Sequence, residues 1–104
     1  MDTDIVIFRR FRDGDVIALF PYLPAECLDA WPCQSYMHIG QHGAADPRIV
    51  HDTRPARPRE YAGLKSELEQ RGYRLAVRRR FPGDAHCRRK AALAAIFPSL
   101  EDTG

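Results

Sequence analysis

Two runs of apolar residues near the N-terminus predict a β-hairpin. In TDIVIFRRFRDGDVIALFP, β-branched and aromatic residues lie on both sides of Asp13-Gly14, a dipeptide that is common in tight hairpin turns. The expected strands cover residues 4–11 and 16–21, and because each has apolar side chains on both faces, both should be largely buried. We expect a positive φ at Gly14, which glycine adopts without strain.

The following segments predict a loop, a third strand and a short helical turn. Residues 21–32 contain three prolines and no sustained period, which indicates a loop. The run CQSYMHIGQH predicts a strand that ends near Gly40. After it, Gly43 should adopt a backbone conformation that residues other than glycine cannot adopt. Asp46 should cap a helical turn over PRIVH, with Pro47 in its first position.

The clearest periodicity in the chain predicts a helix. The run PREYAGLKSELEQRGY has Tyr61, Leu64 and Leu68 at helical spacing. Gly72 follows, so the helix should cover residues 58–71. The preceding segment TRPARP is expected to be irregular, because its two prolines remove backbone donors and restrict their predecessors.

A strand and a second helix are expected after this helix. In YRLAVRRRF, apolar residues from Tyr73 to Phe81 alternate with arginines, which predicts a strand with a buried face and an arginine face. The alanine-rich run that follows, capped by Asp84 and ended by Pro98, predicts the last helix. The order β-β-β-α-β-α indicates an α+β fold with a four-stranded, mostly antiparallel sheet packed by two helices.

Length and composition favour one domain. The chain has 104 residues, of which 44% are apolar, enough for one core, so we expect a single domain over residues 1–104. The three cysteines have no paired spacing, and the N-terminus lacks the basic-then-apolar order of a secretory signal. No apolar run approaches the roughly 20 residues of a membrane-spanning helix. These features predict a cytoplasmic protein with reduced thiols and no membrane partner.

The charge is unevenly placed along the chain. The first 43 residues hold three basic and six acidic side chains, and the other 61 hold thirteen and eight. Between Arg71 and Lys90 there are eight basic residues and one acidic residue. This excess of positive charge produces an electrostatic field that attracts phosphates or acidic proteins. We expect one polyanion-binding surface around Pro82-Gly83, formed by Arg74, Arg78, Arg80, Arg88, Arg89 and Lys90. The alternative is that these side chains only solvate an edge strand and an exposed helix.

The segment SYMHIGQHGAAD contains the residues that could form a metal site. On a strand, residues four apart are separated by about 13 Å, whereas each imidazole on a zinc ion is about 2 Å from the metal. His38 and His42 could then share an ion only if the chain reversed and returned Asp46, His51 or Cys33 toward His38. We therefore expect no metal and no cofactor, and histidines that are hydrogen-bonded within the fold.

The same segment offers the groups of a nucleophilic enzyme. A small hydrolase or metal-dependent enzyme that uses His38, His42 and Asp46 is the alternative function. No nucleophile elbow or glycine-rich oxyanion-hole pattern surrounds these residues. In such an enzyme the nucleophile would be Cys27, Cys33 or Ser35. His38 or His42 would be the base, and Asp46 or Asp52 would orient it.

Trp31 is the single tryptophan of the chain, and it lies in the proline-rich segment. Tryptophan is enriched where proteins bind partners, so Trp31 is a candidate partner-binding residue. A tryptophan in such a segment more often folds back to cover a sheet, and we favour that role.

SYMHIGQHGAAD followed by RPREYAGLKSELEQRGYRL resembles a family of small, uncharacterised bacterial proteins over roughly the middle of the chain. The resemblance implies a bacterial, cytoplasmic protein and carries no catalytic residue. Charge and motifs together predict a non-enzymatic binding module whose basic C-terminal half contacts nucleic acid or an acidic protein. The oligomeric state does not follow from the sequence.

Overall fold

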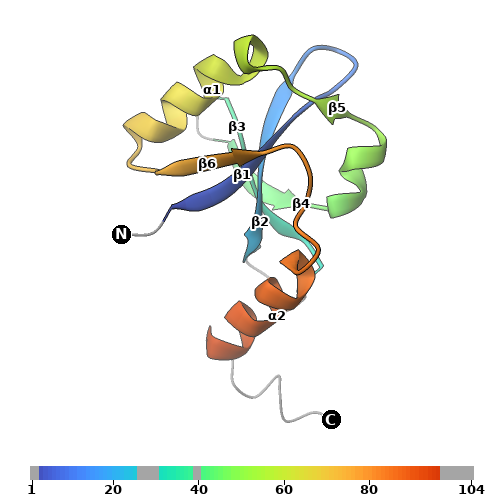
Figure 1. The fold of residues 1–104 in the computed structure, drawn as a ribbon, viewed down its shortest axis with the longest axis vertical. Coiled ribbons are helices and arrows are strands. Elements are labelled where there is room, and N and C mark those ends of the chain that lie inside the picture. The colour runs from blue at the N-terminus through green and yellow to red at the C-terminus, as the bar shows by residue number, and fades with distance from the viewer. Residues whose placement is uncertain (1–2, 26–30, 39–40, 97–104) are drawn as a thin grey trace.

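The computed structural model describes residues 3–25, 31–38 and 41–96 (Figure 1). Within these residues the chain forms six strands, two α-helices and one 3-10 helix. The elements are β1 (Asp4–Arg10), β2 (Val16–Pro24), β3 (Cys33–Met37), β4 (Gln41–Ala45), η1 (Pro47–His51), β5 (Arg54–Pro55), α1 (Pro58–Gln70), β6 (Leu75–Arg78) and α2 (Ala85–Ile96). No helix in this part of the chain has the length and apolarity that crossing a membrane requires.

The strands form one sheet in which β1 is central. The order is β4-β3-β2-β1-β5, and β6 also pairs with β1, in parallel, whereas every other pair is antiparallel. The α+β fold is therefore confirmed, but the sheet has six strands rather than four. The two extra strands come from segments for which no strand of their own was expected.

Strand β4 arises because the chain reverses after Met37. The expected strand ended near Gly40, which lies outside the described residues. Instead β3 ends at Met37, which pairs with Gln41 at the start of β4. Gly43 therefore lies in an extended strand, and the expectation of a special backbone conformation there was wrong. The turns expected from glycine are confirmed, because Gly14 and Gly72 both have φ of 101°.

Prolines take part in the sheet where its ladder is incomplete. Strand β2 continues to Pro24, although a loop was expected from residue 21, and its register against β3 shifts between Phe20 and Pro24. Proline has no N–H to donate, so it is tolerated at such an irregularity. Strand β5, within TRPARP, is only Arg54–Pro55, and it pairs with the C-terminal end of β1.

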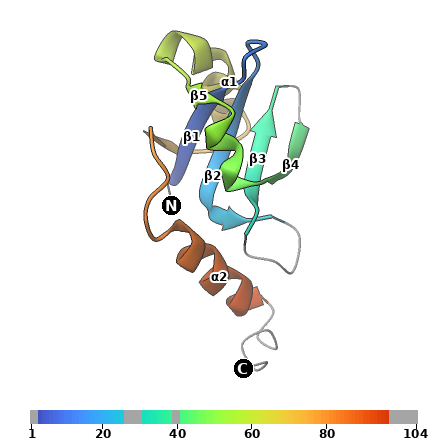
Figure 2. The same ribbon diagram turned by 90° about the vertical axis from the view of Figure 1, so that its right-hand side faces the viewer.

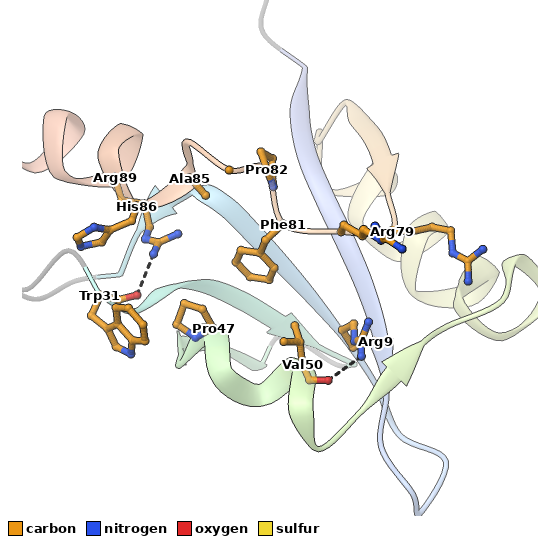
Figure 3. A pocket seen from close by; sticks show the side chains of 12 residues that line it. Arg9, Trp31, Pro47, Val50, Arg79, Phe81, Pro82, Ala85, His86 and Arg89 are labelled. Carbon is orange, nitrogen blue, oxygen red and sulfur yellow. Dashed lines mark hydrogen bonds between the residues drawn. The ribbon is translucent and has the colours of Figure 1, made fainter.

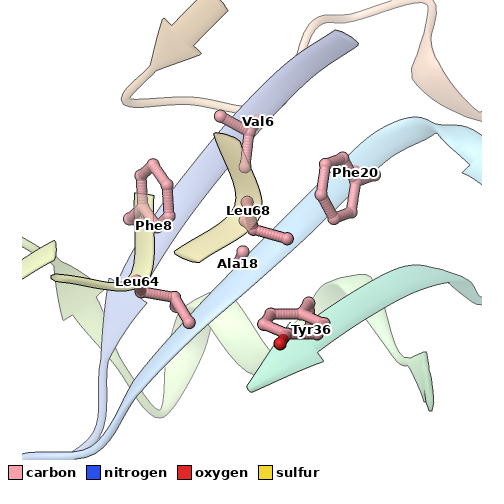
Figure 4. Packing of buried hydrophobic residues seen from close by; sticks show 7 residues of the cluster. All are labelled: Val6, Phe8, Ala18, Phe20, Tyr36, Leu64 and Leu68. Carbon is pink, nitrogen blue, oxygen red and sulfur yellow. The ribbon is translucent and has the colours of Figure 1, made fainter. Parts of the chain in front are cut away.

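The face of the sheet under α1 carries the larger apolar cluster (Figure 4). Leu64 and Leu68 of α1 are buried against it, which confirms the helical periodicity. Full burial of each such side chain stabilises the fold by about 1.5–3 kcal/mol. The sheet contributes Val6, Phe8, Ala18, Phe20 and Tyr36.

Within the described ranges, no long helix covers the opposite face. Its cluster is covered in part by Ile49 of η1 and by Phe81. Phe81 was expected on the same face as Tyr73, but β6 ends at Arg78, so strand alternation does not extend to residue 81. Helix α2 contacts the end of β2 and projects beyond the sheet (Figure 2).

Candidate functional site

The three consecutive arginines at the end of β6, Arg78 to Arg80, are placed by the pairing of β1. Residues Asp4 to Ile7 of β1 pair with β6, whereas Arg9 and Arg10 pair with β5. Strand β5 thus pairs with the part of β1 that β6 would have to pair with in order to continue. The chain therefore leaves the sheet after Arg78, and Arg79 and Arg80 lie exposed in the connection to α2.

Three adjoining hollows surround this connection, and we call them together the arginine groove. Their volumes are about 490, 520 and 660 Å³, and Arg79 lines all three. Among the described residues that line them, none is an aspartate or a glutamate. The cationic lining consists of Arg9, Arg54, Arg57, Arg78, Arg79, Arg80 and Arg89.

Arg9 is a nearly buried cation in the wall of the groove. Its side chain shares the η1 face of β1 with Ile7, and the residue is 8% exposed. Its Nη2 donates to the carbonyl oxygen of Val50 at 2.8 Å (Figure 3) and to that of Thr53 at 2.5 Å. Burial lowers the pKa of Arg9, but arginine stays protonated in proteins. Among the described residues no carboxylate pairs with it, so its charge is held by neutral acceptors.

The charges at the centre of the groove are also uncompensated. Arg79 and Arg80 make no ion pair or hydrogen bond within the described ranges, and Arg78 donates only to its neighbouring carbonyl, that of Val77. Arg54 differs, because its Nη2 lies 2.6 Å from Glu60 Oε2. Hydrogen bonds from Arg54 and from the Arg57 backbone lower the pKa of Glu60 to about 2. The net positive charge therefore concentrates at residues 78–80.

The hollow of about 490 Å³ has an aromatic and apolar wall, and we call it the aromatic cleft (Figure 3). Trp31, His86 and Phe81 line it, and Phe81 points into it from the connection after β6. Trp31 is 41% exposed and packs against neither apolar cluster of the sheet, so the expectation that it covers the sheet was wrong. Pro47 and Val50 of η1 complete this apolar wall.

The expected polyanion-binding surface is brought together only in part. Arg78 and Arg80 lie in the groove, and Arg89 lies at the far side of the aromatic cleft. Arg89 is 2% exposed, however, and donates to the carbonyl oxygens of Pro21 and Trp31. Its first role is therefore to attach α2 to β2. The groove lining does not include Arg74, Arg88 or Lys90.

Four groove arginines, Arg9, Arg54, Arg57 and Arg79, were not among the expected members. The alternation of β1 puts Arg9 on the same face as Ile7, so a buried arginine could have been inferred from the hairpin. Arg79 gave no such signal, because continued alternation would have put it on the apolar face. It reaches the groove only because β6 stops at Arg78.

The histidines of SYMHIGQHGAAD have partners within the fold. His38 Nδ1 lies 2.7 Å from Glu67 Oε1 of α1, and Tyr36 donates its hydroxyl to the same carboxylate. The His42 ring packs edge-on against Tyr36, with centroids 4.6 Å apart. Hairpin pairing places Asp46 beyond one end of β3 and His38 beyond the other, more than about 13 Å apart along the strand. The structure therefore does not unite His38, His42 and Asp46 in one site.

The other candidates for chemistry are placed as follows. Cys33 is fully buried, and burial raises the pKa of its thiol to about 11, so it is not a thiolate at neutral pH. Ser35 donates its hydroxyl to the Gly43 carbonyl, Asp52 is exposed, and Cys27 lies outside the described residues. In the ranges that the structure covers, no three or more His, Cys, Asp or Glu side chains are grouped to hold a metal ion.

The arginine groove thus offers positive charge, hydrogen-bond donors and an aromatic wall. Guanidinium groups fit the oxygens of phosphates and carboxylates, often with two parallel hydrogen bonds. The groove is therefore suited to an anionic ligand. Comparison of the chain with protein-family models, with curated proteins and with solved structures finds no match.

Proposed function

We propose that the protein is a binding module that holds nucleic acid in the arginine groove. The observation that carries this proposal is the run of Arg78, Arg79 and Arg80, which lines the groove and has no carboxylate partner in the described structure. A buried charge without a counterion is costly, and an anionic ligand would compensate both Arg9 and this run.

Nucleic acid fits this lining better than an acidic protein does. The three hollows meet at Arg79 and together extend past both flanks of the connection after β6. Successive cations along such a path match the regular charges of a phosphate backbone. An aromatic wall beside the cations suits bases, whereas an acidic peptide has no need of one.

Charge reversal in the groove tests the proposal. Binding of a fluorescein-labelled oligonucleotide is measured by anisotropy over a range of salt concentrations, for wild type and for Arg79→Glu/Arg80→Glu. With about four phosphate contacts, the log-log dependence of affinity on salt should have a slope of about −3 to −4. The double variant should bind more weakly whatever the base sequence, with a slope shallower by about 1.5–2.

Arg12→Glu/Lys90→Glu is the matched control. It makes the same change in net charge at two exposed residues outside the groove lining, so it should retain most of the affinity. Equal losses in both double variants would show that binding is not located in the groove. No binding to any oligonucleotide at low salt would exclude nucleic acid and favour an acidic protein as the partner.

A further inference from the structure

Trp31 is held in a fixed position at the wall of the aromatic cleft. Its Nε1 donates to Asp46 Oδ1 at 3.0 Å, and its carbonyl oxygen accepts from Arg89 Nη2 at 3.1 Å. The His86 ring packs edge-on against the indole, with centroids 6.1 Å apart. The indole N–H is thus already bonded within the fold, while the residue remains 41% exposed and lines the cleft.

Asp46 stabilises this arrangement. Arg48 Nη2 lies 2.7 Å from Asp46 Oδ2, and the Arg48 guanidinium carbon lies 5.8 Å from the centre of the indole. Hydrogen bonds from Arg48 and Trp31 hold the pKa of Asp46 down at about 2, so the carboxylate is charged at neutral pH. A preorganised ring loses little conformational freedom when a ligand stacks on it.

The aromatic cleft adjoins the phosphate-binding part of the groove. Arg79 and Arg80 line both the cleft and the neighbouring hollow. The cleft volume of about 490 Å³ lies within the range of roughly 300–1,000 Å³ that is usual for small-molecule sites. It can therefore accept a group of the size of a nucleobase while the attached phosphates remain near the arginines.

We infer that the aromatic cleft receives an unpaired base, which stacks on Trp31, and that the protein prefers single-stranded to double-stranded nucleic acid. The bases of a duplex are stacked on one another, whereas a single strand can place a base face against an aromatic ring. This inference rests on the proposed function, because the arginines must hold the backbone while the base enters.

The single tryptophan allows a direct test. Oligothymidylate and a duplex of the same length are titrated into the wild-type protein, and fluorescence of Trp31 is recorded together with anisotropy of the labelled strand. The single strand should quench Trp31, and the duplex should not. Trp31→Ala should weaken binding of the single strand by about 5- to 100-fold and binding of the duplex by less than twofold.

Trp31→Phe is the conservative variant, because it keeps a stacking face and loses the bond to Asp46. It should retain more affinity for the single strand than Trp31→Ala, and circular dichroism verifies that both variants are folded. Equal affinity for single strand and duplex, without quenching, would overturn the inference. If charge reversal at Arg79 and Arg80 still weakened that binding, the proposed function would remain. Absence of binding to both probes at low salt would overturn the proposed function as well.

Discussion

Two polar regions of this protein differ in how their charges are balanced. One is the cluster of Tyr36, His38, His42 and Glu67 between β3, β4 and α1, and the other is the arginine groove. In the cluster, Glu67 accepts from Tyr36 and contacts His38, so donors and acceptors lie within reach of each other. In the groove, Arg9 has only neutral oxygen acceptors, and Arg79 has no partner in the described ranges.

This difference separates a structural role from the binding role that we propose for the groove. SYMHIGQHGAAD contains several residue types that can do chemistry, but Tyr36 and His38 contact Glu67 of α1, and Ser35 bonds to the Gly43 carbonyl within the sheet. The run Arg78 to Arg80 at the end of β6 has less chemical variety, and among the described residues it has no carboxylate partner. Polar side chains that satisfy one another stabilise a fold, whereas charges without counterions are available to a ligand.

The largest expected effect comes from removing the centre of the cluster. Tyr36 is fully buried between the sheet and α1, where it packs with Leu64 and Leu68. Tyr36→Ala should lower the free energy of unfolding by about 3–5 kcal/mol, the usual cost of truncating a buried aromatic residue. Denaturant unfolding measures this. Arg80→Ala, at the exposed centre of the groove, should change the same quantity by less than about 0.5 kcal/mol; similar losses in both variants would contradict the comparison.

A smaller loss of stability is expected at Arg9, which belongs to the groove but is built into the fold. Arg9→Met keeps much of the side-chain length and removes the donors to Val50 and Thr53. The carbonyl oxygens left without a partner should cost about 1–3 kcal/mol of unfolding free energy. Arg9→Met should also weaken oligonucleotide binding. A variant that is as stable as wild type would show that these hydrogen bonds contribute nothing to the fold.

Local patterns in the sequence predicted the local elements well. Leu64 and Leu68 determine the buried face of α1 through contacts within one helix, and Gly14 and Gly72 have the positive φ that their turns need. The N-terminal hairpin follows from two apolar runs on either side of a turn dipeptide. In each case the interactions that decide the structure lie within a few residues of one another.

The parts of the fold that the sequence did not predict depend on contacts between segments that are far apart in the chain. Strand β5 exists because two residues meet the backbone of β1, some 45 residues earlier in the chain. The alternation of YRLAVRRRF could not show that β5 would stop β6 at Arg78 and turn Phe81 to the other face. The acceptors for Arg9 lie 41 and 44 residues away. The groove was therefore only half predicted, through Arg78, Arg80 and Arg89.

The smallest expected effect concerns Glu60, the carboxylate that balances charge beside the groove. Its Oε2 lies 2.6 Å from Arg54 and 3.3 Å from Arg10. Because its pKa is about 2 in the folded protein and about 4.3 in an unfolded chain, folding favours its charged form. Its contribution to stability is therefore complete above about pH 4.5 and is lost as the pH falls toward 2.

Glu60→Gln tests this by removing the titrating group while keeping the shape of the side chain. Wild type should be more stable than the variant at neutral pH, and the difference should shrink as the pH falls from about 4.5 toward 2. Thermal unfolding at a series of pH values gives the difference directly, since the other carboxylates titrate in both proteins. Glu60→Gln should also leave Arg54 uncompensated in the groove and so increase the affinity for an oligonucleotide at low salt. A difference in stability that does not change with pH would show that the ion pair is not coupled to folding, and an unchanged affinity would place Arg54 outside the path of the nucleic acid.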